Sequence, residues 1–75
     1  RDYLTKLLGL LSSQNAEVLM LREMHGFSYG EVANICDCTV DAIKSRLKRA
    51  RKEIVEKATL LNLDLEKEPV SHETL

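Results

Sequence analysis

The sequence predicts an all-α domain of four helices, which ends in a helix-turn-helix with a long recognition helix. Apolar residues recur at intervals of three and four in four segments. Capping residues and a glycine separate these segments. About three residues lie between a short third segment and a much longer fourth, which is helix-turn-helix spacing. The length of 75 residues fits one small domain with a single apolar core.

The first two helices are predicted over roughly 2–11 and 14–25. Leucines at helical spacing define the first: Leu4, Leu7, Leu8 and Leu11. Ser12 and Ser13 offer N-cap oxygens to the second. Its apolar residues are too many for one narrow stripe, which predicts a central helix: Val18, Leu19, Leu21 and Met24. Gly26 should end it, because glycine accepts a left-handed backbone at a helix C-terminus.

The third helix has the clearest start signal. Ser28 and Glu31 have capping-box spacing, and Phe27 and Val32 occupy the two positions of a hydrophobic staple. The helix should end near Cys36. After it, Asp37 introduces a turn and Thr39 is the next N-cap.

The fourth helix is predicted from Val40 to at least Lys57, and would be roughly 33 Å long if it continued to Leu61. Its buried stripe steps by three and four residues: Val40, Ile43, Leu47, Ala50 and Ile54. This stripe leaves a polar, basic front facing outward: Lys44, Ser45, Lys48, Arg49 and Lys52. The domain is assigned to 1–61. The acidic segment 62–75, which contains Pro69, is expected to be a frayed or disordered tail, or one held by a partner.

Charge is segregated along the chain. The net charge of −1 by itself argues against nucleic-acid binding. However, 3 basic and 5 acidic residues occupy 1–38, 7 basic and 3 acidic residues occupy 39–57, and 1 basic and 4 acidic residues occupy 58–75. The resulting charges are −2, +4 and −3. One positive element is therefore offered to an anionic partner.

Other classes of function find little support. There is no membrane-spanning stretch and no signal segment, so a cytoplasmic protein without a membrane partner is expected. The start at Arg1, without methionine, suggests a fragment. Ser45 has no companion base, so no catalytic residue, cofactor or small-molecule substrate is predicted. Cys36 and Cys38 are too few for zinc and are expected to be small core residues; a metal site completed by His25 is the alternative.

A recognition helix needs a capped start, an apolar back and a polar, basic front, because residues near its start reach base edges in the major groove. The fourth helix combines all three. The run from Ser28 to Arg51, with its Glu31-Val-Ala33, Lys44-Ser-Arg46 and Arg49-Ala-Arg51 steps, resembles region four of bacterial sigma factors. The extracytoplasmic-function (ECF) group is the nearest match. Glu17-Val-Leu-Met-Leu-Arg-Glu23 is similar to the family's preceding helix.

This resemblance implies a domain that recognises the −35 promoter element and docks on the β flap of core RNA polymerase. It also implies an anti-sigma factor that masks these surfaces. By position, the base-facing residues would be Lys44, Ser45, Lys48 and Arg49. Phosphate contact, helix packing or capping would fall to Arg46, Arg51, Lys52 and Thr39. Exposed apolar residues of the first two helices could receive a flap or anti-sigma helix: Leu4, Leu10 and Met20.

The chain departs from the family at Ser12 and Ala16, where proline and arginine are usual, and at Asp41-Ala42, where Gly-Thr is common. Asp41 either repels the DNA backbone or accepts a hydrogen bond from a cytosine amino group. Two alternatives remain for the whole chain. One is the output domain of a LuxR-type response regulator. The other is a protein-interaction module that uses the basic helix on an acidic surface or on anionic lipid.

Overall fold

The computed structural model of the protein describes residues 2–67, in which every regular element is a helix and no strand occurs. The all-α prediction is confirmed. The elements in chain order are α1 (Asp2–Gly9), α2 (Ser13–Leu19), the π-helix η1 (Met20–Met24), α3 (Tyr29–Ile35) and α4 (Val40–Lys67).

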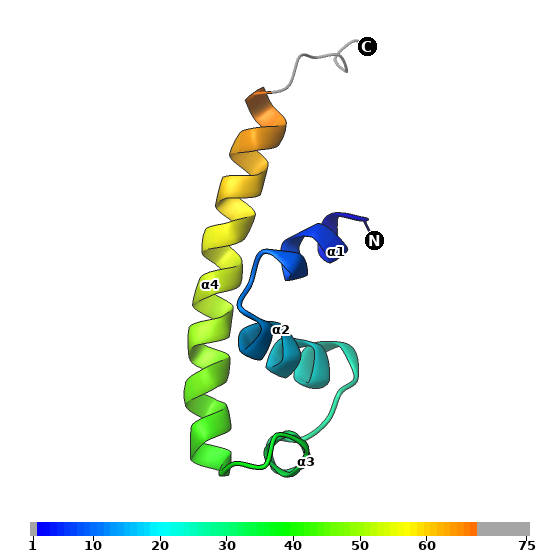
Figure 1. The fold of residues 1–75 in the computed structure, drawn as a ribbon, viewed down its shortest axis with the longest axis vertical. Coiled ribbons are helices and arrows are strands. Elements are labelled where there is room, and N and C mark those ends of the chain that lie inside the picture. The colour runs from blue at the N-terminus through cyan, green and yellow to red at the C-terminus, as the bar shows by residue number, and fades with distance from the viewer. Residues whose placement is uncertain (1, 68–75) are drawn as a thin grey trace.

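The long helix α4 organises the fold (Figure 1). With 28 residues, it is about 42 Å long. The short helices contact one side of it in succession: α3 beside its start, α2 further along, and α1 beyond α2. The last turns of α4 continue past α1. One side of α4 therefore carries the rest of the domain, and the other side is open.

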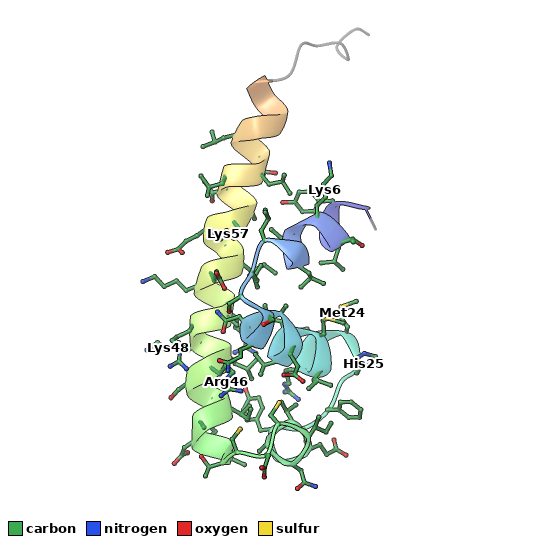
Figure 2. The ribbon with its side chains drawn as sticks, viewed as in Figure 1. Lys6, Met24, His25, Arg46, Lys48 and Lys57 are labelled. Carbon is green, nitrogen blue, oxygen red and sulfur yellow. The ribbon has the colours of Figure 1, made fainter. Side chains whose placement is uncertain are left out.

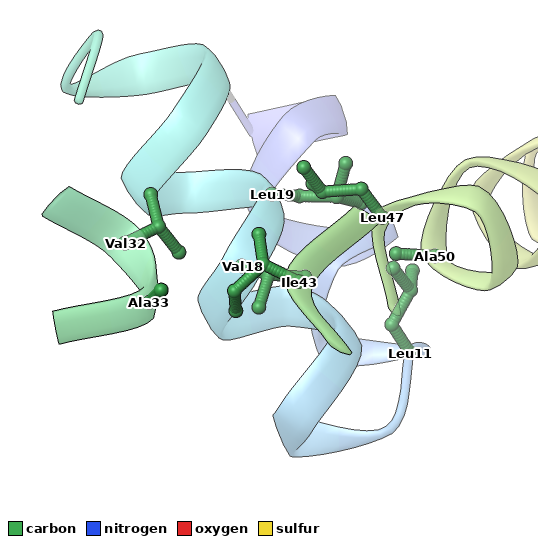
Figure 3. Close-up of a cluster of buried hydrophobic side chains, with 8 residues drawn as sticks. All are labelled: Leu11, Val18, Leu19, Val32, Ala33, Ile43, Leu47 and Ala50. Atoms are coloured by element: carbon green, nitrogen blue, oxygen red, sulfur yellow. The ribbon is translucent and has the colours of Figure 1, made fainter. Parts of the chain in front are cut away.

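The core lies where α2, α3 and α4 meet (Figure 3). Four of its side chains are fully buried: Val18, Val32, Ile43 and Leu47. Four smaller or less enclosed residues complete the cluster: Leu11, Leu19, Ala33 and Ala50. Because α4 supplies the buried residues at three- and four-residue steps, the apolar stripe fixes its rotation about its own axis.

The second helix starts as predicted but does not stay α-helical. Ser12 caps it, since its Oγ accepts the amide N–H of Asn15 at 3.3 Å. From Met20 onward the helix widens to a π-turn, in which the His25 amide donates to the carbonyl of Met20 at 3.0 Å. The wider turn shifts the following residues out of the α-helical register. Met24 is therefore 54% exposed, and its predicted place among the central apolar residues is wrong.

The helix-turn-helix follows its local signals. Gly26 has φ 72° after η1. Ser28 and Glu31 make both hydrogen bonds of the capping box, at 3.1 and 2.8 Å. The turn after α3 passes through Asp37 at φ 57°. Thr39 then caps α4, where its Oγ1 accepts the N–H of Ala42 at 3.1 Å. The predicted turn at Asp37 and N-cap at Thr39 are confirmed.

One expectation for the fourth helix fails. Val40 was assigned to the buried stripe but is 38% exposed, because as the first residue of α4 it has helical neighbours on one side only. The helix continues to Lys67, beyond the predicted minimum of Lys57, so the described part of the segment 62–75 belongs to α4. The remainder of the predicted tail, 68–75, lies outside the described residues. Leu60 and Leu63 are exposed, and Leu61 is half-buried.

No helix within residues 2–67 combines the length and the apolar composition needed to cross a bilayer.

Candidate nucleic-acid interface

The first half of α4 presents a continuous polar and cationic surface, which we call the basic face. Its members are all exposed: Lys44, Ser45, Lys48, Arg49 and Lys52. Figure 2 shows Lys48 on the side of α4 that is turned away from the other helices. No acidic residue occurs between Lys44 and Lys52 in the sequence. The basic face is therefore a positive, solvent-exposed surface on the open side of the helix.

The orientation of the basic face depends on polar contacts as well as on the core. Glu53 of α4 accepts hydrogen bonds from Asn15 Nδ2 at 2.7 Å and from the amide N–H of Ser12 at 3.3 Å. The hydrogen bond from Asn15, and to a smaller extent the one from Ser12, lowers the pKa of the Glu53 carboxyl. The start of α2 is thus tied to the middle of α4. This contact was not predicted, because its partners are far apart in the sequence.

Arg46 does not belong to the basic face. It is half-buried on the side of α4 that faces α2 (Figure 2). Its Nε is buried and has no hydrogen-bond partner within residues 2–67. The structure therefore separates Arg46 from Lys44 and Lys48, although all three stand within five consecutive positions.

Arg51 is also set apart, because it forms an ion pair on the flank of the domain. Its Nη2 lies 2.9 Å from Glu23 Oε2. Glu23, and to a lesser extent the hydroxyl of Tyr29, raise the pKa of the Arg51 guanidinium. The centre of the Tyr29 ring lies 4.6 Å from the guanidinium carbon of Arg22. The Nη1 of Arg22 donates a hydrogen bond to the carbonyl of Phe27 at 2.8 Å. Arg51 thus links α4 to η1.

The two cysteines behave as small apolar residues. Cys36 and Cys38 are free, half-buried and packed against the core. Burial, followed by the nearby Glu17 carboxylate, raises the pKa of the Cys36 thiol, so this thiol stays protonated at neutral pH. His25 stacks on Phe27, with ring centroids 5.9 Å apart. Among the described side chains, no three from His, Cys, Asp or Glu are placed to hold a metal ion, which leaves the His25 alternative without support.

A second surface feature is an open groove of about 590 Å³ between α1 and α2. Its apolar lining comes from both helices and η1: Leu8, Leu11, Ala16, Met20 and Leu21. Glu17 and His25 are among its polar lining residues. Of the exposed residues considered for docking, Met20 lines the groove, whereas Leu4 and Leu10 are exposed outside it.

Comparison with known proteins gives a consistent result. The family model described as "Sigma-70, region 4" matches residues 1–54. The ECF RNA polymerase sigma factor SigC of Mycobacterium tuberculosis is 35% identical over 54 residues, which are 72% of this chain and 29% of that protein. EcfG of Rhodopseudomonas palustris, also an ECF RNA polymerase sigma factor, is 46% identical over 44 residues, covering 59% and 24% of the two chains.

The ECF RNA polymerase sigma-E factor of Escherichia coli is 49% identical over 39 residues, covering 52% of this chain and 20% of that protein. The chain therefore spans less than a third of the length of these relatives. No solved structure gives a significant match.

Proposed function

Because the chain belongs to the sigma-70 region 4 family, we propose that it recognises the −35 promoter element as part of an ECF sigma factor. The observation that carries this proposal is the placement of the basic face. An α-helix fits the major groove of B-DNA, and α4 is held by α2 and α3 on one side while its cationic side is open. The proposed role is binding without catalysis, in the cytoplasm.

The residues divide by their surroundings. Lys44, Ser45, Lys48 and Arg49 are exposed near the start of α4, which is the part of a recognition helix that reaches base edges. Lys52, two turns further on than Lys44 and also exposed, is assigned to phosphate contact.

The remaining residues of the predicted site, one threonine and two arginines, have supporting roles. Thr39 positions the helix by capping it. Arg46 and Arg51 are assigned to packing, because one is half-buried and the other is paired with Glu23.

The groove between α1 and α2 is the proposed docking site on RNA polymerase. Its lining is mainly apolar, as expected for a site that receives the apolar side of a helix, here one from the β flap. An anti-sigma factor that covered the groove would block the contact with RNA polymerase, and one that covered the basic face would block the contact with DNA. The groove and the basic face are formed by different elements, so both can be occupied at once.

The test is transcription from a promoter library by core RNA polymerase together with the full-length protein that carries this chain. We expect promoter-specific initiation with a defined −35 preference. Lys48→Ala should relax the preference locally and cost about 1–3 kcal/mol of binding free energy. Lys6→Ala is the matched control, because it removes an equal charge from an exposed position on α1. This variant should leave the −35 preference unchanged.

Two results would contradict the proposal. Initiation that needs a different sigma factor would indicate an ordinary regulator, such as the LuxR-type output domain. Binding of acidic protein or anionic lipid without any DNA preference would indicate an interaction module instead.

A further inference from the structure

Asp41 is an acidic residue on the otherwise cationic reading surface. It stands three, four and seven residues before Lys44, Ser45 and Lys48, so all four lie on one face of α4. Asp41 is exposed and belongs to the first turn of the helix. Within residues 2–67, its carboxylate takes part in no ion pair and no side-chain hydrogen bond. Both carboxylate oxygens are therefore available as hydrogen-bond acceptors.

A carboxylate in this position discriminates among bases. In the major groove, cytosine presents only a donor, its N4 amino group. Guanine presents the acceptors N7 and O6, thymine presents the acceptor O4, and adenine places the acceptor N7 beside its N6 amino group. An acceptor with full negative charge is attracted by the first pattern and repelled by the acceptors of the others. The same charge is repelled by phosphate, which favours an orientation toward the bases.

A simpler role for Asp41 is stabilisation of the helix N-terminus, which favours acidic residues in the first turn. An acidic residue on any face of the first turn would stabilise the N-terminus in this way. Thr39 already accepts the N–H of Ala42, so Asp41 is not required as the cap. The side on which Asp41 lies, shared with Lys44 and Lys48, is what points to DNA.

We propose that Asp41 is a specificity-determining residue, which accepts a hydrogen bond from the N4 amino group of a cytosine in the −35 element. The cytosine lies beside the bases read by Lys44 and Ser45, because Asp41 precedes them by one helical turn. This inference rests on the proposed function and adds to it the identity of one base pair. The preference for that cytosine over other bases should be about five-fold or more.

The experiment measures base preference over a randomised −35 element, with the full-length protein bound to core RNA polymerase. Asp41→Asn is the informative variant. Asparagine pairs with adenine through N6 and N7, so the preferred base should change from cytosine to adenine at one position only. Asp41→Ala should remove the preference there and leave the other positions as they are. Circular dichroism of each variant checks that the helices form.

Glu56→Gln is the matched control. Glu56 is an exposed acid on the same helix, about 22 Å along the axis from Asp41. Glu56→Gln changes the net charge of the protein by the same amount as Asp41→Asn. It should leave the base preference at every position unaltered. A wild-type protein that selects a −35 sequence but keeps the same profile after Asp41→Ala would overturn the inference alone.

An Asp41→Ala variant that binds all sequences more tightly, without a change in preference, would also overturn the inference, because Asp41 would then only repel phosphate. A wild-type protein that selects no −35 sequence would overturn the proposed function as well.

Discussion

Lys52 and Arg51 are neighbours in sequence, yet they should respond differently when DNA binding is measured against salt. Lys52 is exposed and makes no ion pair with any described residue, whereas Arg51 is paired with Glu23 at 2.9 Å. A cation that neutralises a phosphate releases a counterion from DNA, and this release sets the salt dependence of binding. Replacing Lys52 by alanine should therefore reduce the salt dependence, while Arg51→Ala should leave it nearly unchanged.

The expected size follows from the counterion relation. Each phosphate contact adds roughly 0.9 to the slope of log K against log salt concentration. Loss of the Lys52 contact should thus lower the slope by about 0.9. A rise in salt concentration from 50 to 200 mM would then reduce the DNA-binding constant of the variant by a factor about 3.5 times smaller than the reduction for the parent. Arg51 can reach phosphate only by leaving Glu23, so its contribution to the slope should be far smaller.

Fluorescence anisotropy of a labelled promoter duplex, titrated at several salt concentrations, measures both slopes. The binding partner should be the full-length protein with core polymerase, because the polymerase contributes contacts of its own. Glu23→Gln is a useful companion, since it frees Arg51 without removing its charge. Equal losses of slope for Lys52→Ala and Arg51→Ala would refute the distinction between a free and a paired cation.

The interactions that hold α4 in place allow three further tests. Asp37→Val should lower the free energy of unfolding by about 1–2 kcal/mol, because φ 57° is a left-handed conformation, whereas Asp37→Gly should not lower it. Similar urea midpoints for the two variants would contradict this. Leu47→Ala removes a fully buried side chain and should cost about 2–5 kcal/mol in urea unfolding. A cost near zero would show that Leu47 is not in the core. Hydrogen bonds lower the pKa of Glu53 below its ordinary 4.5, so the stability they provide is present above that pH and is lost as the pH falls through the lowered value. Glu53→Gln should therefore unfold with a weaker acid dependence than the parent, and identical pH profiles would rule out this contribution.

Local signals in the sequence predicted much of the fold. The capping box of Ser28 and Glu31, the turn at Asp37 and the cap at Thr39 each involve partners only a few residues apart. Such interactions can be recognised from sequence spacing alone. The exposed basic face was predicted in the same way, since the buried positions Ile43 and Leu47 determine which residues of the helix face outward.

The remaining features depend on contacts between distant segments. Arg51 and Glu23 are 28 residues apart, and nothing near either residue identifies the other as its partner. The half-buried state of Arg46 depends on where α2 crosses α4. The π-turn at Met20–Met24 changes the helical register, so a pattern based on 3.6 residues per turn misplaced Met24. Val40 was misplaced because periodicity does not show where the neighbouring helices stop covering the stripe.

The length of α4 has a mechanical consequence. The helix is held around Leu47 by the core, at Glu53 by the hydrogen bonds from α2 and the residue before it, and further along by α1, whose Tyr3 hydroxyl lies 3.4 Å from Asn62 Oδ1. Asn62 lies about 22 Å along the helix axis from Leu47. One continuous helix therefore connects the basic face with α1, which forms one wall of the groove. A change in how the first turns of α4 are seated on DNA would be transmitted along this helix to α1.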